Sequence, residues 1–214
     1  MTTGRNVATP PRRRRARRGE GDKLRDQITE VVERLLIETG DEAAVTIRAV
    51  ADAVGVTPPS VYLHFADKDE LLFAVCERHF AELDRVTQEA AAGSEDLLES
   101  LALRGRAYIG FGVQHPEQYR ILFMGKPSRT PENFNLERLG DAAAFGHLLE
   151  HVITCVQAGL IEGDPLQVSL VLWAGVHGVT SLLISKPEFP WPDVNVMADR
   201  LCRALVYGLK PRSG

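Results

Sequence analysis

Two short segments with clear helix start and stop signals, separated by one glycine, constrain the fold of this chain most. Thr46 precedes the apolar positions of a helix over residues 47–54, where its hydroxyl can accept from a first-turn N–H. Gly55 can adopt the left-handed backbone conformation that ends a helix. Thr57 is predicted to cap the next helix, and Pro58 occupies its first position, where a missing N–H removes no hydrogen bond. The sequence therefore predicts two short helices joined by a turn of about three residues.

Apolar residues also recur at helical spacing along the rest of the chain, and no alternating strand pattern competes with them. Asp67 and Glu70 form a capping box that opens a long helix. Other helices are predicted over residues 22–40, 97–115, 116–124, 136–158, 166–185 and 194–208, with loops at 125–135 and 186–193. We therefore predict an all-α fold with a disordered tail at 1–20, a three-helix helix-turn-helix domain at 21–68 and a helical regulatory and dimerisation domain at 69–210.

Composition excludes several other classes of protein. The net charge of −4 argues against a protein that coats nucleic acid by bulk electrostatics, although residues 1–19 carry seven arginines and no acid. The most apolar stretch, residues 168–184, is interrupted by polar side chains, so a membrane span is not expected. Charged residues follow the basic start where a signal peptide needs an apolar core, and we predict a cytoplasmic protein. The three cysteines are odd in number and widely spaced, so they indicate buried thiols and neither a disulfide framework nor a zinc site.

A helix-turn-helix presents one short helix to the major groove, and the segment from Thr46 to Phe65 meets its demands. Alanines allow the two helices to approach, while valines and Phe65 can form the core. Side chains predicted to face outward are Arg48, Thr57, Ser60, Tyr62 and His64. The short hydroxyls suit base edges or phosphates, and Tyr62 and His64 can reach phosphate oxygens. Lys68 adds a cation beside the first turn of the following helix, a common phosphate site.

Residues 46–65, together with 67–72, resemble the N-terminal segment of the tetracycline-repressor (TetR) family almost throughout. The resemblance implies an all-helical homodimer whose third helix reads DNA and whose C-terminal domain senses a small molecule. Pro59 and His64 depart from the residues common in that family, which puts the operator sequence in doubt but not DNA binding. By position, the family's DNA contacts fall on Thr46, Arg48, Thr57, Pro58, Ser60, Tyr62, His64 and Lys68.

Residues 108–124 and 173–178 resemble segments of regulatory domains in the same family, the second being similar to the Trp-His-Gly motif of one subgroup. The side chains most able to line an apolar pocket are Tyr108, Phe111, Phe123, Met124, Phe145, Trp173 and His177. Each of these could instead fill a helical core, since aromatic residues at helical spacing usually pack. As a set they favour a pocket, and because they include no carboxylate or lysine we expect a fairly apolar ligand.

The helices predicted at 166–185 and 194–208 carry more apolar surface than one buried face needs, which indicates an interface. In the resembled family these helices pair with their copies, so the operator is expected to be a pseudo-palindrome. The hypothesis is that ligand favours a dimer whose heads are spaced wrongly for DNA. Repression is the default direction, and activation stays open. The rivals are an architectural DNA-binding protein without a ligand and a helical enzyme that uses the C-terminal cavity.

Two smaller features leave alternatives open. His147 and His151, one helical turn apart, could bind a metal, but two ligands are too few and we expect no metal or cofactor. No catalytic motif stands out, so an enzyme is not expected. The arginine-rich tail is either a solvating extension or, as we hypothesise, an arm that follows the minor groove or the phosphates.

Overall fold

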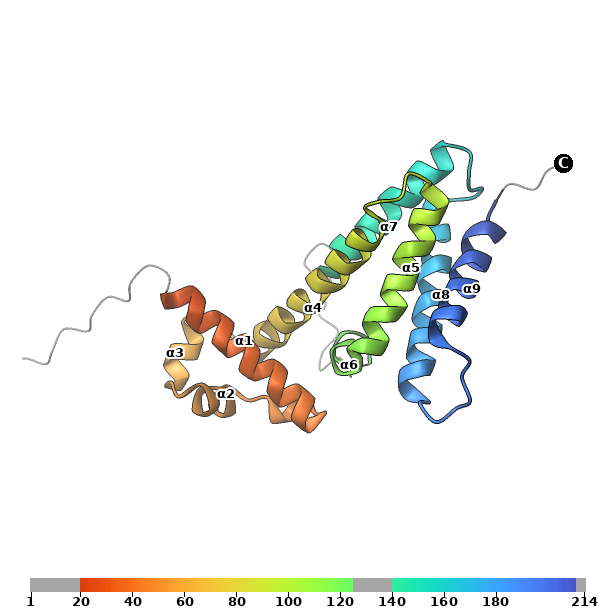
Figure 1. Cartoon of the computed structure of the whole chain (residues 1–214). Coiled ribbons are helices and arrows are strands. Elements are labelled where there is room, and N and C mark those ends of the chain that lie inside the picture. Colours follow the sequence, from red (N-terminus) through yellow and green to blue (C-terminus); the bar gives the residue numbers. More distant parts are fainter. Residues whose placement is uncertain (1–19, 125–139, 211–214) are drawn as a thin grey trace, which may run out of the picture.

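The computed structural model describes residues 20–124 and 140–210, and over these ranges the chain is helical without strands (Figure 1). The elements are α1 (Glu20–Thr39), the 3₁₀ helix η1 (Glu42–Ala44), α2 (Ile47–Val54), α3 (Pro58–Tyr62), α4 (Lys68–Ala91), α5 (Leu97–Gln114), α6 (Pro116–Phe123), α7 (Gly140–Gln157), α8 (Pro165–Ser185) and α9 (Val194–Gly208). These bounds confirm the predicted all-α fold. The arginine-rich tail at 1–19, the loop predicted at 125–135 and the predicted start of the helix at 136 lie outside the described residues.

The N-terminal core is formed by α1, α2, α3 and the first turns of α4. It is built from aliphatic side chains and Phe65, which is 1% exposed. Thr46 accepts from the Ala49 N–H at 3.1 Å, and Gly55, at φ +80°, ends α2. Both local signals read from the sequence therefore act as predicted.

The start of α3 differs from the prediction. Thr57 makes no capping bond to the backbone, because its hydroxyl lies 3.0 Å from the Ser60 hydroxyl. The helix also ends at Tyr62, after five residues, so Leu63 lies at its carboxyl end with most of its surface in solvent. Thr57 therefore occupies the N-cap position as predicted but its side chain makes no capping bond, and Pro58 at the first helical position remains the local start signal.

The C-terminal core surrounds α5, which lies among α4, α7, α8 and α9 (Figure 1). Helix α5 approaches its neighbours closely at two glycines. A Cβ on Gly105 would lie 2.8 Å from the Cys202 sulfur, and one on Gly112 would lie 2.9 Å from a ring carbon of Tyr119. Such distances leave no room for a methyl group, so glycine at these positions sets how tightly the bundle packs.

Two helices connect the two cores. Leu71 and Val75, near the start of α4, are buried in the N-terminal core, whereas Phe80 and Leu83 on the same helix are buried in the C-terminal one. The short helix α6 also touches both, since Ile121 packs on the N-terminal core and Tyr119 is buried in the C-terminal core. A displacement of either helix therefore changes the packing of both cores.

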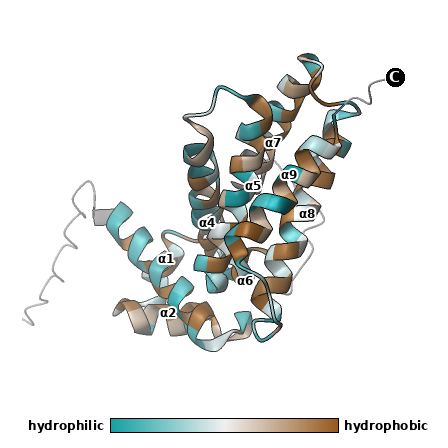
Figure 2. Ribbon diagram, turned by 45° about the vertical axis from the view of Figure 1, so that its right-hand side comes forward, coloured by the Kyte–Doolittle hydropathy of each residue, from teal (hydrophilic) through white to brown (hydrophobic). Residues whose placement is uncertain are grey.

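Apolar side chains remain in solvent on the outer helices. Brown segments recur along α8 and α9, which lie at the edge of the molecule (Figure 2). The large exposed side chains there are Leu166, Leu170, Val171, Leu182 and Val196. Helix α8 is also long and apolar enough to cross a membrane by length and composition, although 33% of its most apolar window is buried within the subunit.

Candidate nucleic-acid interface and ligand pocket

The outward face of α2 and α3 carries most of the side chains that the sequence assigned to DNA. The Arg48 side chain is 89% exposed, Tyr62 is 56% exposed, and Thr57 and Pro58 are also exposed. Ser60 and His64 are half-buried at the edge of this face. The structure thus brings these positions onto one solvent-facing surface held by the N-terminal core.

Several of these groups already have partners within the chain, which orient them. The Thr57 and Ser60 hydroxyls pair with each other, and one of the two protons remains for an outside acceptor. Arg48 Nε lies 4.0 Å from Asp52 Oδ2, a loose pair between exposed side chains that contributes little to stability. Thr46 accepts from its own helix, so its O–H can still donate to a phosphate. The surface is therefore partly preorganised and keeps its donors.

Lys68 begins α4 beside Glu42, the first residue of η1. Its ammonium donates to the Glu42 carbonyl oxygen, which holds the side chain against the N-terminal core. Asp67 accepts from the Glu70 N–H at 2.8 Å, as predicted, but the Glu70 carboxylate reaches back to the Ala66 N–H and not to that of Asp67. Lys68 is thus a positioned cation next to a helix amino end, where phosphates commonly bind.

Sequence reasoning missed two residues of this surface. Leu63 is the residue that follows α3, it keeps a helical backbone conformation, and its side chain is 81% exposed. An apolar side chain there can contact thymine methyl groups or sugars. Arg25, on α1, places its guanidinium 4.8 Å from the centre of the Phe65 ring and adds a cation behind α3. Nothing in the sequence indicated that α3 ends at Tyr62, so the exposure of Leu63 could not be predicted.

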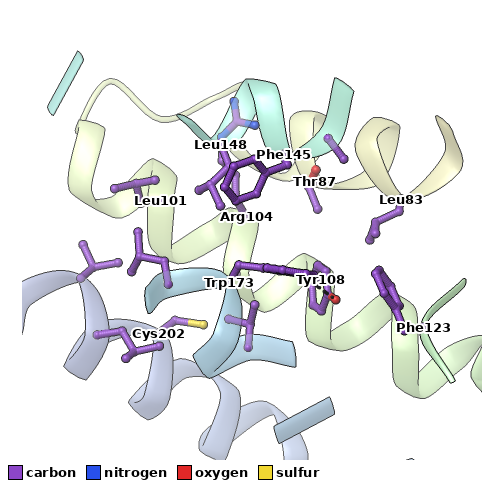
Figure 3. A pocket seen from close by; sticks show the side chains of 16 residues that line it. Leu83, Thr87, Leu101, Arg104, Tyr108, Phe123, Phe145, Leu148, Trp173 and Cys202 are labelled. Atoms are coloured by element: carbon purple, nitrogen blue, oxygen red, sulfur yellow. Dashed lines mark hydrogen bonds between the residues drawn. The ribbon is translucent and has the colours of Figure 1, made fainter. Parts of the chain in front are cut away.

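A cavity of about 80 Å³ opens within the C-terminal core (Figure 3). Its walls come from α4, α5, α6, α7, α8 and α9, so residues more than a hundred positions apart face one another. The lining residues are Leu83, Thr87, Leu101, Arg104, Gly105, Tyr108, Phe123, Ala144, Phe145, Leu148, Leu172, Trp173, Val176, Cys202, Leu205 and Val206. The cavity is mostly apolar, and it is smaller than a drug-sized ligand needs.

Four of the seven side chains expected at a pocket line this one: Tyr108, Phe123, Phe145 and Trp173. Their rings meet around the cavity, with Phe145 edge-on to Trp173 at 6.1 Å between centroids. The other three do not line it. Phe111 is buried in the core, Met124 ends α6 at the surface, and His177 lies behind the wall.

His177 belongs to a buried polar network beside the cavity. The Tyr119 hydroxyl lies 2.6 Å from His177 Nδ1, the Tyr108 hydroxyl lies 3.2 Å from both groups, and Trp173 Nε1 donates to the Tyr108 hydroxyl at 3.3 Å. Burial raises the pKa of Tyr119 to about 12 and lowers the pKa of His177. The network is therefore uncharged at neutral pH, and it ties the pocket wall to α6 and α8.

Arg104 is the pocket residue that sequence reasoning missed, and it corrects the expectation of a lining without a strong charge. Its Nη2 donates to Gln88 Oε1 at 2.8 Å, while its Nε is buried and has no hydrogen-bond partner among the described residues. Burial lowers the pKa of Arg104 and nearby Asp84 raises it. The sequence around Arg104 gave no sign that this side chain lines a cavity. The cavity wall there forms only when α4, α5 and α7 pack together.

The histidines and cysteines have ordinary partners. His147 Nδ1 lies 2.9 Å from Asp84 Oδ1, and His151 Nε2 donates to the Leu97 carbonyl at 3.0 Å. Among the residues described, no group of three possible metal ligands comes together. All three cysteines are free thiols, and burial raises the pKa of each to about 11.

Family models match most of the described chain. Residues 28–75 match the model for bacterial regulatory proteins of the tetR family. Residues 101–208 match a model described as a tetracyclin repressor-like C-terminal domain. The two matches cover both the surface around α3 and the cavity.

Curated relatives and solved structures agree with these models. The chain is 32% identical over 111 residues to the HTH-type transcriptional activator FasR of Mycolicibacterium smegmatis, covering 51% of this chain and 50% of the relative. It is 28% identical over 114 residues to the HTH-type transcriptional regulator EthR of the same species, covering 53% and 48%. The chain thus spans about half the length of these relatives. A Rhodococcus protein of unknown function shares the fold, with a TM-score of 0.75 and 21% identity over 95% of this chain and 100% of that one.

Proposed function

Because this chain belongs to the tetracycline-repressor family of DNA-binding transcriptional regulators, we propose that it is a repressor released from a pseudo-palindromic operator by a small, mostly apolar ligand. The observation that carries the proposal is the exposed face of α3, which a well-packed N-terminal core presents, with Tyr62 at the end of α3 and Lys68 at the start of α4. A short helix held in this way can enter a major groove without reorganisation. Thr57 and Ser60 then face the bases, while Tyr62, His64 and Lys68 face the phosphates.

A homodimer is the second part of the proposal, and α8 supports it. Val171, Ala174, Gly178 and Leu182 follow one another at steps of three or four residues and share one face of the helix. That face is open to solvent, and no atom of another described element lies within 4 Å of a Cβ built on Gly178. A glycine inside a helix costs about 1 kcal/mol relative to alanine, so close approach of a second α8 is a physical reason for its presence.

A charge on this face is expected to separate the subunits. Leu182→Glu would bury a carboxylate in the interface, and we expect light scattering after size exclusion to give the monomer mass at concentrations where the unmodified protein is dimeric. The matched control is Leu166→Glu, since Leu166 is on the opposite side of α8 and both leucines are 49% exposed. If the Leu182 variant dimerises as tightly as the control, the proposed face is wrong.

Helix α6 offers the route from ligand to DNA. Phe123 lines the cavity, and Ile121, two residues earlier, packs against the N-terminal core. A ligand larger than the 80 Å³ cavity has to widen it, so it binds the conformation in which Phe123 and α6 have moved. In that conformation the two N-terminal DNA-binding domains of the dimer are spaced wrongly for DNA. By linkage, operator binding weakens ligand binding by the same factor by which the ligand weakens operator binding.

Selection from random duplex DNA tests the DNA-binding proposal and identifies the operator at the same time. The enriched sequences are expected to be inverted repeats whose half-sites lie about 34 Å, one helical turn, or a multiple of it apart. A promoter carrying the selected site should then be less active with the protein than without it. No enrichment would refute sequence-specific binding, and a more active promoter would make the protein an activator, as the relative FasR is named.

A further inference from the structure

The cavity has one charged end in an otherwise apolar wall. Arg104 extends along this wall beside Phe145 and Leu148 (Figure 3). Among the lining residues that the structure describes, it is the only cation and there is no anion. Thr87, on α4, also lines the cavity. Its hydroxyl donates to the Asp84 carbonyl, so the Thr87 hydroxyl oxygen can still accept a hydrogen bond.

Among the residues that the structure describes, no anionic group pairs with Arg104. Asp84 is the carboxylate that acts on it electrostatically, but its oxygens are 2.9 and 3.1 Å from His147 Nδ1, and no ion pair joins it to Arg104. His151 donates to a backbone carbonyl, and burial lowers its pKa. Gln88 supplies a neutral acceptor for Nη2, and Nε–H has none. A half-buried guanidinium whose Nε–H is enclosed without an acceptor is stabilised when an anion accepts from it.

We propose that the effector is an amphipathic monocarboxylate whose carboxylate accepts from Arg104 and whose hydrocarbon part fills the cavity. The inference rests on the proposed function, because it takes this cavity as the effector site. A single cation matches a single negative charge, and a guanidinium suits the planar, two-oxygen geometry of a carboxylate. The aromatic and aliphatic lining, which includes Trp173, Leu172 and Leu101, provides the apolar surface that the tail requires.

The test compares octanoate with octanamide, which has the same tail and shape but no charge. Isothermal titration calorimetry on the full-length protein is expected to show octanoate binding at least about tenfold more tightly, the effect of one charge-assisted hydrogen bond. Arg104→Gln should remove this preference, and Arg104→Lys should retain part of it. Because the chain also contains Trp191, quenching is measured in a Trp191→Phe variant, where Trp173 is the remaining tryptophan and its quenching places the ligand in the cavity. Arg85→Gln is the charge-matched control, since Arg85 lies exposed on α4 and pairs only with Glu82 and Glu89 in the described chain.

The outcomes separate the inference from the function on which it rests. Equal affinities of octanoate and octanamide for the unmodified protein would overturn the proposal that a carboxylate binds Arg104. An unchanged preference for octanoate in Arg104→Gln would overturn it too. In either case a neutral ligand that still releases DNA leaves the proposed regulator intact. Failure of octanoate to bind at all also overturns the inference. If the arginine variants fold poorly, the two ligands compared on the unmodified protein decide the question alone.

Discussion

Replacement of Tyr62 and Lys68 together by alanine is expected to weaken operator binding by more than about hundredfold. Tyr62 ends α3 and Lys68 begins α4, and a dimer loses four proposed phosphate contacts, each worth about 1 kcal/mol or more. The salt dependence should change as well, because two lysines fewer per dimer make the slope of log K against log salt less negative by about 1.8. Fluorescence anisotropy with a selected operator at several salt concentrations measures both quantities.

A charge-matched control distinguishes a lost contact from a lost charge. Arg85→Ala removes a cation from the same helix as Lys68, but Arg85 lies exposed several turns away, so binding should be nearly unchanged. Lys68 also donates to the Glu42 carbonyl, and thermal unfolding of the variant shows whether the N-terminal core survives. Undiminished operator binding by a folded double variant would refute the placement of these contacts.

Gly112→Ala is expected to lower the free energy of unfolding by about 3 kcal/mol or more. The added methyl group would overlap Thr180 and come within 2.9 Å of the Tyr119 ring, and both neighbours are fully buried. Overpacking of this kind forces side chains off their preferred rotamers or shifts the backbone. Urea unfolding at a fixed protein concentration measures the loss, since dimerisation makes stability depend on concentration.

The control for this prediction lies on the same helix. A Cβ on Gly110 meets nothing within 4 Å, so Gly110→Ala should leave the protein equally stable or stabilise it by up to about 1 kcal/mol. A similar effect of the two substitutions would mean that α5 does not approach α6 and α8 as closely as described. A severe loss at Gly112 would also disturb the bond between Tyr119 and His177, and hence the wall of the cavity.

Most of the helices could be predicted because their signals are local. The capping side chains of Thr46 and Asp67, and the left-handed Gly55, act within four residues of themselves, and the structure has each as the sequence indicated. Thr57 shows the limit of such reasoning. A threonine before a helix has more than one hydrogen-bond partner within reach, and here the neighbouring Ser60 hydroxyl competes with the backbone.

The pocket was only half predictable, for a different reason. Tyr108 and Phe123 were identified as able to line a cavity, but so was Phe111, which packs in the core. Sequence spacing gives the face of a helix on which a side chain lies. It does not say whether a neighbouring helix fills that face or leaves a void.

The helix-turn-helix around Gly55 follows from the amino-acid sequence alone, since its helix start and stop signals, turn and outward polar side chains all lie within about twenty consecutive residues. Packing between helices is what ends α3 at Tyr62, brings α6 against both cores, and places Arg104 in an apolar cavity with Asp84 turned toward His147. Those features depend on which side chains meet across helices distant in the chain. The partners of a buried charge are set by that packing, and no local pattern records them.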